Sequence, residues 1–406
     1  MCSQRPWTLS DHRTILGAPR MNPAVFELGC NYWPRRRAMY MWRDLDLGEI
    51  REDLAQIREL GFEVVRIFAL TEDFLPDPRS VDPDRVAALV DVARAAKDAR
   101  LRVVPTMIVI NMSGRAWWPQ WMLAGDGRPR DLYTDPTLLE AQALLVETCA
   151  RALAGDDAIR ALDLANEIDD ALMPPSRDAG RLWASVLSAA ARRGAPNVPI
   201  QIGAHLPSLA RANNMRVDDL AAFADEDCMH AYPLYSDVAR SPLDPDLVPF
   251  ACALTAALAG SGRRVLMQEF GLCTAPRGSP GLSIEDDFLG APRRQYLASE
   301  EEAATYYRDV LERLVQSGAA GAYAWCYADY DPVLWDRPPL DRAVRERTFG
   351  LVRSDGSRKP AAEVFRAFAG RPCAAQPLSI AAGNSDSYYA DPSRRFRELY
   401  AGYTAR

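Results

Sequence analysis

The chain has 406 residues, of which 48% are hydrophobic and 25% charged, an ordinary balance for a globular protein with a large core. Its formal net charge of −7 gives no support for a nucleic-acid-binding protein, which usually carries a basic face. The sequence has no apolar run long enough for a membrane span, and its first 20 residues lack the apolar segment of a secretory signal. We therefore expect a cytoplasmic protein with no nucleic-acid or membrane partner.

The cysteine and histidine patterns argue against a metal centre or a disulfide framework. The eight cysteines are scattered and form no C-x-x-C pair, and the chain has only three histidines. No glycine-rich dinucleotide fingerprint or phosphate-binding loop is present. The sequence therefore implies no metal and no cofactor.

Short apolar runs alternate with amphipathic segments from about residue 25 to residue 370. The candidate strands are 25–31, 64–69, 102–110, 161–165, 198–203, 228–231, 265–270 and 321–326. The candidate helices are 47–60, 86–99, 138–154, 181–193, 217–224, 247–259, 300–317 and 361–368.

Strands that alternate with helices predict right-handed βαβ units and a parallel sheet. Eight such repeats fit a closed (β/α)8 TIM barrel better than an open sheet. We predict an α/β fold with one catalytic barrel over residues 25–372, an N-terminal extension over 1–24, and a C-terminal tail over 373–406 packed on or near the barrel. Three long segments, 111–135, 271–298 and 327–349, follow strands and would lie on the C-terminal face of the barrel, where functional loops of this fold gather.

Two carboxylates stand directly at strand ends. Glu167 follows "ALDLAN" and Glu269 follows "RVLMQ". Polar residues at the carboxyl ends of barrel strands face the mouth of the active site, so a barrel can bring these two face to face. Cleavage of a glycosidic bond uses two such carboxyl groups. Either glutamate by itself could instead cap the next helix or pair with an arginine.

Six strand-end motifs together resemble the clan A glycoside hydrolases, most closely glycoside hydrolase family 5, the cellulase and mannanase family. The motifs, in chain order, are "ELGCNYWP", "GFEVVRIF", "LANE", "HAYP", "QEFG" and "GAYAWCYAD", and they span nearly the whole barrel. The segment "FGLVRSDGSRKPAAEVFRAF" also resembles the way such barrels close. The resemblance implies a retaining mechanism with Glu167 as acid/base and Glu269 as nucleophile.

The resemblance also implies substrate-binding roles around the two glutamates. Asn166 would bind the sugar 2-hydroxyl, and Arg66 and Tyr232 would keep Glu269 ionised. Glu167 would need a raised pKa, from partial burial and from the second carboxylate, to be protonated near neutral pH. Arg66 could alternatively form a structural salt bridge at the barrel rim, and Tyr232 could serve only as packing.

Further candidates line the expected mouth of the barrel. His230 precedes Tyr232 by two positions, and Trp325 ends strand eight, where its ring could form a platform for a sugar. Alternatively, His230 is a satisfied polar residue and Trp325 belongs to the core. The remaining candidate substrate-binding residues follow strands one and three: Asn31, Trp33, Asn111, Trp117 and Trp118.

One position departs from the family pattern. Family 5 enzymes commonly carry a histidine just after strand three, where "VINMSG" here has Asn111. We therefore expect a retaining β-glycoside hydrolase acting on manno- or gluco-configured oligosaccharides or glycosides, with different substrate contacts on that side. The alternatives are a β-galactosidase of a related clan A family, a non-catalytic carbohydrate-binding barrel and a metal-dependent barrel enzyme.

Overall fold

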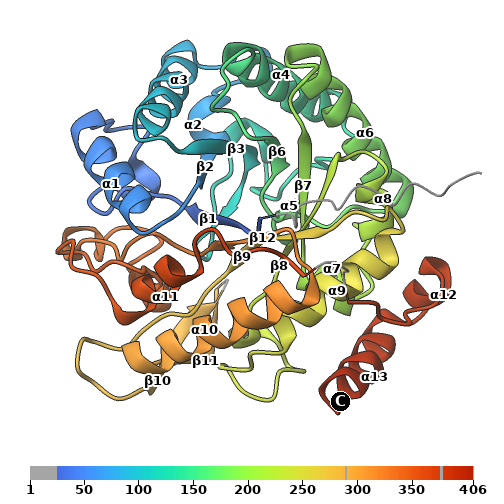
Figure 1. The fold of residues 1–406 in the computed structure, drawn as a ribbon. Coiled ribbons are helices and arrows are strands. Elements are labelled where there is room, and N and C mark those ends of the chain that lie inside the picture. The colour runs from blue at the N-terminus through green and yellow to red at the C-terminus, as the bar shows by residue number, and fades with distance from the viewer. Residues whose placement is uncertain (1–24, 289, 375–377, 406) are drawn as a thin grey trace, which may run out of the picture.

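The computed structural model describes residues 25–288, 290–374 and 378–405, and the expected extension over residues 1–24 lies outside them. Within these residues, eight parallel strands close a barrel in the order β1-β2-β3-β6-β7-β8-β9-β12, which is also their order in the chain (Figure 1). The strands are β1 (Glu27–Asn31), β2 (Val64–Leu70), β3 (Arg102–Val109), β6 (Leu162–Ala165), β7 (Ile200–His205), β8 (Glu226–His230), β9 (Val265–Phe270) and β12 (Gly321–Ala324). The predicted TIM barrel is confirmed.

Helices follow the strands and surround the barrel (Figure 1). The larger set is α1 (Leu47–Glu59), α3 (Pro83–Asp98), α4 (Pro136–Leu153), α6 (Arg177–Gly194), α9 (Leu247–Ala259), α10 (Glu300–Ser317) and α11 (Pro360–Phe368). Short helices are α2 (Thr71–Phe74), α5 (Ile168–Ala171), α7 (Leu206–Ala210) and α8 (Val217–Ala221). Single 3-10 turns are η1 (Ala38–Tyr40), η2 (Gln120–Met122), η3 (Pro233–Tyr235), η4 (Pro332–Leu334) and η5 (Val344–Thr348).

Two of the helices around the barrel, α3 and α4, begin at an Asp-Pro pair. Asp82 and Asp135 accept hydrogen bonds from backbone amides of the first turn, and the following proline occupies the first helical position, where no amide donor is needed. The apolar pattern predicted that α3 begins at residue 86, three residues late. The first turn is polar, so only its capping residues indicate where the helix starts.

The interior of the barrel changes from apolar to polar along the strands. Val64, Val104, Ala161, Cys228, Leu266 and Tyr323 form one buried interior cluster. Side chains two positions apart on a strand share a face, so the next interior positions are Arg66, Thr106, Asp163, His230, Gln268 and Trp325. The barrel interior therefore has an apolar layer, followed by a polar layer nearer the carboxyl ends of the strands.

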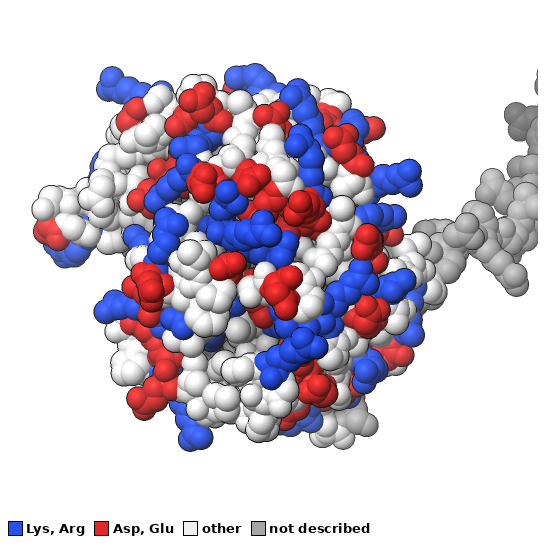
Figure 2. All heavy atoms as spheres, turned by 90° about the vertical axis from the view of Figure 1, so that its left-hand side faces the viewer, with Lys and Arg blue, Asp and Glu red and all other residues white. Residues whose placement is uncertain are grey.

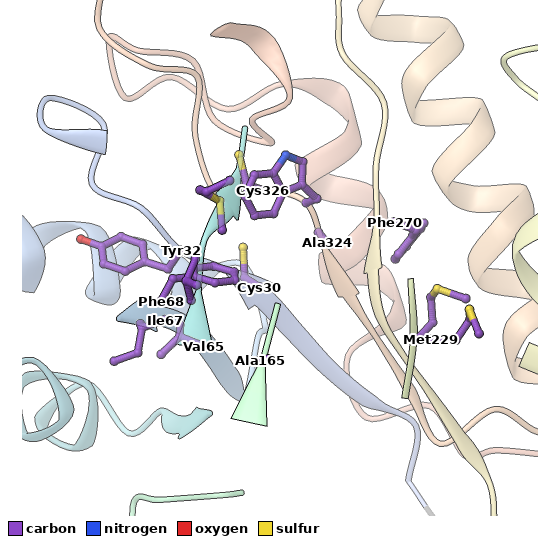
Figure 3. Close-up of a cluster of buried hydrophobic side chains, with 14 of the residues drawn as sticks. Cys30, Tyr32, Val65, Ile67, Phe68, Ala165, Met229, Phe270, Ala324 and Cys326 are labelled. Carbon is purple, nitrogen blue, oxygen red and sulfur yellow. The ribbon is translucent and has the colours of Figure 1, made fainter. Parts of the chain in front are cut away.

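Alternate positions pack outside the barrel wall. On β2, Val65 and Ile67 belong to the main hydrophobic cluster, together with Cys30, Met229 and Phe270 from other strands (Figure 3). This packing determines which side chains of each strand point into the barrel. A shift of one residue in register would turn the outward-facing apolar side chains to the interior and the interior side chains outward.

Three features of the fold were not predicted from the sequence. The segment 271–298 contains an antiparallel hairpin of β10 (Leu282–Phe288) and β11 (Ala291–Leu297), and β4 (Asn111–Met112) pairs with β5 (Arg115–Ala116) after β3. The tail contains α12 (Ser385–Tyr389) and α13 (Pro392–Thr404). On α13, Phe396 contacts Phe250 of α9, with 5.3 Å between the ring centroids.

The surface on the side that carries α1 has acidic and basic side chains interspersed (Figure 2). Arg43 pairs with Glu72 and Asp73, and Arg358 with Glu59, so neighbouring charges are of opposite sign. Among the described residues, no helix combines the length and apolarity that a bilayer span requires.

Candidate active site

Glu167 and Glu269 occupy irregular backbone at the ends of their strands. Glu167 follows β6 and adopts the left-handed conformation, with φ 41° and ψ 48°, which is rare for a residue with a side chain and is typical of functional sites. Glu269 lies where the register between β8 and β9 shifts, opposite His230. Because the shift interrupts the regular alternation, Glu269 can join Gln268 in facing the mouth of the barrel.

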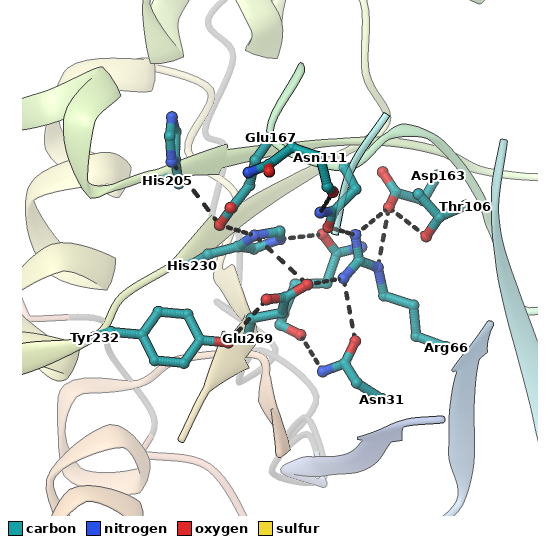
Figure 4. Close-up of polar contacts among 12 residues, drawn as sticks. Asn31, Arg66, Thr106, Asn111, Asp163, Glu167, His205, His230, Tyr232 and Glu269 are labelled. Carbon is teal, nitrogen blue, oxygen red and sulfur yellow. Dashed lines mark hydrogen bonds and ion pairs between the residues drawn. The ribbon is translucent and has the colours of Figure 1, made fainter. Parts of the chain in front are cut away.

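The two glutamates face each other across His230 (Figure 4). One carboxylate oxygen of Glu167, one of Glu269 and one ring nitrogen of His230 all lie within 4.8 Å of one another. In retaining glycosidases the two carboxyl groups are about 5–5.5 Å apart, whereas inverting enzymes leave about 6.5–9.5 Å for a water molecule. In this site the two carboxyl groups adjoin one another, with one oxygen of each within 4.8 Å.

Arg66 connects Glu269 to the polar layer inside the barrel (Figure 4). Its side chain is completely buried, and its Nη1 donates to a Glu269 oxygen and, at 3.1 Å, to Asn31. Nε and Nη2 donate to the same Asp163 oxygen at 3.0 and 2.8 Å, and Nη2 also donates to Asn166 at 2.9 Å. Arg66 thus forms ion pairs with both Glu269 and Asp163.

The other Glu269 oxygen accepts a hydrogen bond of 2.8 Å from the Tyr232 hydroxyl. Asn31 does not line the pocket. Its amide donates to the carbonyls of Gln268 and Ala324, at 3.0 and 3.1 Å, and so ties β1 to β9 and β12 beneath Glu269. Asn31 therefore positions the site and is not a direct sugar contact, which corrects the expectation for this residue.

His230 is held by contacts at both ring nitrogens. Nδ1 lies 2.8 Å from Glu167, and Nε2 lies 3.0 Å from the side-chain oxygen of Gln268. Gln268 in turn donates to Gln201 at 2.8 Å. Gly203 lies against this arrangement: a Cβ at that position would be 2.8 Å from Gln268 and 2.9 Å from His230, so a larger residue would displace them.

His205 is a site residue that the sequence analysis missed. It ends β7, its Nε2 lies 2.8 Å from Asp169, and its Nδ1 lies 3.8 Å from Glu167 and 3.7 Å from Asp170. The predicted strand ended at residue 203, two residues early. The rule that selected Glu167 and Glu269, a polar residue at a strand end, would have selected His205 had the strand end been placed correctly.

His230 and His205 reverse the expected direction of the pKa shift of Glu167. Burial raises the pKa of Glu167, but the hydrogen bond to His230 and the positive charges of His205 and His230 outweigh it and lower the pKa to about 2. Burial lowers the pKa of His205, but the carboxylates of Asp169 and Asp170 outweigh it and raise the pKa to about 10. The expected raised pKa of Glu167 is therefore not found in the ligand-free protein, because the neighbouring imidazoles lower it.

Seven of the candidate residues line one common pocket. They are Asn111, Asn166, Glu167, His230, Tyr232, Glu269 and Trp325. Asn111, at the position where a histidine was expected, receives a hydrogen bond of 3.1 Å on its carbonyl from the Asn166 amide. The pocket also contains residues that the sequence analysis did not select, namely Asp170, His205, Arg211, Tyr235, Arg293, Arg345 and Glu346.

The tryptophans after strands one and three do not line this pocket. Trp33 and Trp117 are each 1% exposed, and Trp33 stacks on Phe68 with 5.5 Å between the ring centroids. The Trp117 indole donates to the carbonyl of Met112 at 3.2 Å. Trp118 is partly buried against the main hydrophobic cluster. All three were expected to bind sugar. The loops fold Trp33 and Trp117 inward, where they serve as packing, and Trp118 lies outside the residues that line the pocket.

Two groups of carboxylates and histidines could bring ligand atoms together for a metal ion. They are Glu167, Asp170 and His205, and Glu167, His230 and Glu269. In the second group both nitrogens of His230 already contact protein oxygens, so binding a metal would require His230 to give up a contact.

Comparison with known proteins supports the same fold. No family model and no curated protein sequence matches the chain. A GH5_18 protein from Streptomyces cattleya in complex with GlcNAc superposes with a TM-score of 0.77 at 22% identity, over 94% of this chain and 91% of that one. The chain therefore shares the (β/α)8 barrel fold of that protein.

Two further solved structures are similar to this chain. A variant of the Streptomyces cattleya GH5_18 protein in complex with Manβ1-4GlcNAc gives a TM-score of 0.76 at 21% identity, over 93% of this chain and 90% of that one. An exo-β-1,4-mannosidase from Opitutaceae bacterium strain TAV5 gives 0.69 at 25% identity, over 85% of this chain and 59% of that one.

Proposed function

We propose that this protein is a retaining β-glycoside hydrolase that acts on short β-linked, manno-configured oligosaccharides or glycosides. The observation that carries the proposal is the facing pair Glu167 and Glu269, with oxygens within 4.8 Å, of which only Glu269 is bonded to both Arg66 and Tyr232. This asymmetry suits two different roles for two identical side chains. The manno preference is supported by the similar structures, which include a Manβ1-4GlcNAc complex and an exo-β-1,4-mannosidase.

In the first step, a Glu269 oxygen attacks the anomeric carbon and forms an ester with the sugar. The bond to the leaving oxygen breaks, and that oxygen receives a proton from Glu167. His230, whose Nδ1 lies 2.8 Å from Glu167, is the group placed to exchange that proton with Glu167. Arg66 and Tyr232 stabilise the carboxylate charge of Glu269 before attack and again when the ester is broken.

In the second step, Glu167 removes a proton from water as the water attacks the anomeric carbon. The ester bond breaks, Glu269 is released as a carboxylate, and the product has the configuration of the substrate. Asn166 lines the pocket between Arg66 and Asn111, where it can bind the sugar 2-hydroxyl. A cytoplasmic location, expected from the sequence, favours short oligosaccharides over polymers as substrates.

The test is a screen of 4-nitrophenyl β-mannoside, β-glucoside and β-galactoside, followed by Manβ1-4GlcNAc, with the product anomer assigned by NMR. We expect the mannoside to be the best substrate and the β-anomer to form first. Preference for the galactoside would favour the related β-galactosidase. Binding of Manβ1-4GlcNAc without turnover would favour a non-catalytic carbohydrate-binding barrel, and loss of activity with a chelator would favour a metal-dependent enzyme.

A further inference from the structure

Besides the facing pair, the same pocket contains the carboxyl groups of Asp170, Asp237 and Glu346, of which Glu346 shares its part of the wall with Glu269 and Trp325. Glu346 belongs to η5, in the segment that follows β12, and is 5% exposed. It lines the pocket together with Glu269, Trp325 and Tyr235. No strand end or sequence motif points to it, because its placement depends on how the segment 327–349 folds back over the barrel.

The nearest cation to Glu346 is already engaged elsewhere. Arg345 donates through Nη1 to Asp286 of the β10–β11 hairpin and to the carbonyl of Asp287, both at 2.7 Å. Its Nε donates to the Tyr235 hydroxyl at 3.0 Å and lies 3.4 Å from Glu346. Asp286 and Glu346 thus place two carboxylates around one guanidinium.

The remaining protein partners of the Glu346 carboxylate are Tyr235 and Trp325. The Tyr235 hydroxyl donates to it at 3.3 Å, longer than the usual 2.7–2.8 Å of such a bond. Burial raises the pKa of Glu346, and Arg345, Tyr235 and Trp325 oppose that effect only in part. A buried carboxylate of this kind is stabilised when further donors reach it.

Sugar hydroxyls are the donors that this pocket is placed to receive. A ring stacked on Trp325, with its anomeric carbon at Glu269 and its 2-hydroxyl at Asn166, presents its remaining hydroxyls to the rest of the pocket wall. A carboxylate offers two oxygens, so it can accept from two hydroxyls at once, while its charge disfavours an anionic sugar.

We propose that Glu346 is a specificity-determining residue of the central subsite, which accepts hydrogen bonds from hydroxyls of a neutral sugar other than the 2-hydroxyl. The inference rests on the proposed glycosidase function. It identifies the β12 loop, held by Asp286 through Arg345, as the element that recognises the sugar.

The experiment compares wild type with Glu346→Gln on 4-nitrophenyl β-mannoside and on its 3-, 4- and 6-deoxy analogues. We expect the variant to lose about ten- to hundredfold in kcat/KM on the parent mannoside. On at least one deoxy analogue the loss should shrink to less than about threefold, because the hydroxyl that the carboxylate binds is missing there. Glu301→Gln, on the exposed start of α10, is the matched charge control and should leave all four rates unchanged.

Asp286→Asn distinguishes loss of a sugar contact from a general loosening of the β12 loop. It weakens the hold on Arg345, so it should lower the melting temperature and reduce the rates on all four substrates by a similar factor. If Glu346→Gln behaves in that uniform way, or keeps wild-type kcat/KM, the subsite role is wrong.

Binding distinguishes this inference from the proposed function. Titration calorimetry with Manβ1-4GlcNAc, in a Glu167→Gln background that does not consume it, should show weaker binding when Glu346→Gln is added. A wild-type chain that binds the disaccharide but hydrolyses nothing would contradict the proposed function alone. Equal affinity with and without Glu346→Gln would contradict the role of Glu346 alone.

Discussion

Removal of the Arg66 side chain gives a quantitative test of the polar layer inside the barrel. Arg66 is fully buried and donates to Asp163, Glu269, Asn31 and Asn166. In Arg66→Met, Asp163 keeps only the Thr106 hydroxyl, at 2.8 Å, because its other oxygen has no hydrogen-bond partner. A buried charge left without its partner costs about 3–5 kcal/mol.

The expected shift in melting temperature follows from the size of the protein. The entropy of unfolding is about 2.1 cal/mol/K per residue, so that of a 406-residue chain is roughly 0.85 kcal/mol/K. The loss in Arg66→Met then corresponds to a melting temperature lower by about 4–6 °C, measured by circular dichroism. The control is Arg102→Met, because Arg102 is 44% exposed and its pair with Glu27 should be worth less than about 1 kcal/mol.

A second substitution tests the cause of the loss. If the uncompensated charge of Asp163 is responsible, the double variant Arg66→Met, Asp163→Asn should have a free energy of unfolding at least about 1 kcal/mol higher than that of Arg66→Met. If Arg66→Met is no less stable than the Arg102→Met control, the reasoning about the buried charge is refuted. If Asp163→Asn gives no recovery of stability, the loss of stability comes from packing. One such contact is that of the Arg66 guanidinium carbon with the Phe68 ring, whose centroid is 4.6 Å away.

Three further predictions concern the pocket. Glu269→Ala should abolish turnover, and azide should restore it with an azide product of inverted configuration by NMR; activity like wild type would exclude Glu269 as nucleophile. Trp325→Ala should lower kcat/KM by more than about tenfold through loss of the sugar platform, and a folded variant within about twofold of wild type would show that the ring binds no sugar. The pKa of His205 is raised to about 10 from an ordinary 6.5, so its charge stabilises the fold below about pH 6.5 and this contribution is lost as pH rises through 10. The difference in melting temperature between wild type and His205→Gln should therefore shrink from pH 6 to pH 10, and a constant difference would contradict the assigned charge.

The sequence by itself determined the barrel and the positions at its mouth. The apolar runs and helical periods predicted the strands and helices because both patterns arise from local backbone geometry, which repeats every two or every 3.6 residues. The same periodicity placed Glu167 and Glu269 at strand ends, the resemblance to clan A glycoside hydrolases added Arg66 and Tyr232, and the parallel arrangement then required these side chains to meet. Their convergence could therefore be predicted without coordinates.

The tertiary structure alone decided what surrounds those residues. Trp33 and Trp117 turn inward, and Glu346 reaches the pocket, because side chains in long loops are directed by contacts with residues distant in the sequence and not by a repeating backbone. The lowered pKa of Glu167 likewise depends on His205, which is brought to 3.8 Å by a neighbouring strand. Electrostatic energy depends on such distances and on burial, neither of which a linear pattern specifies.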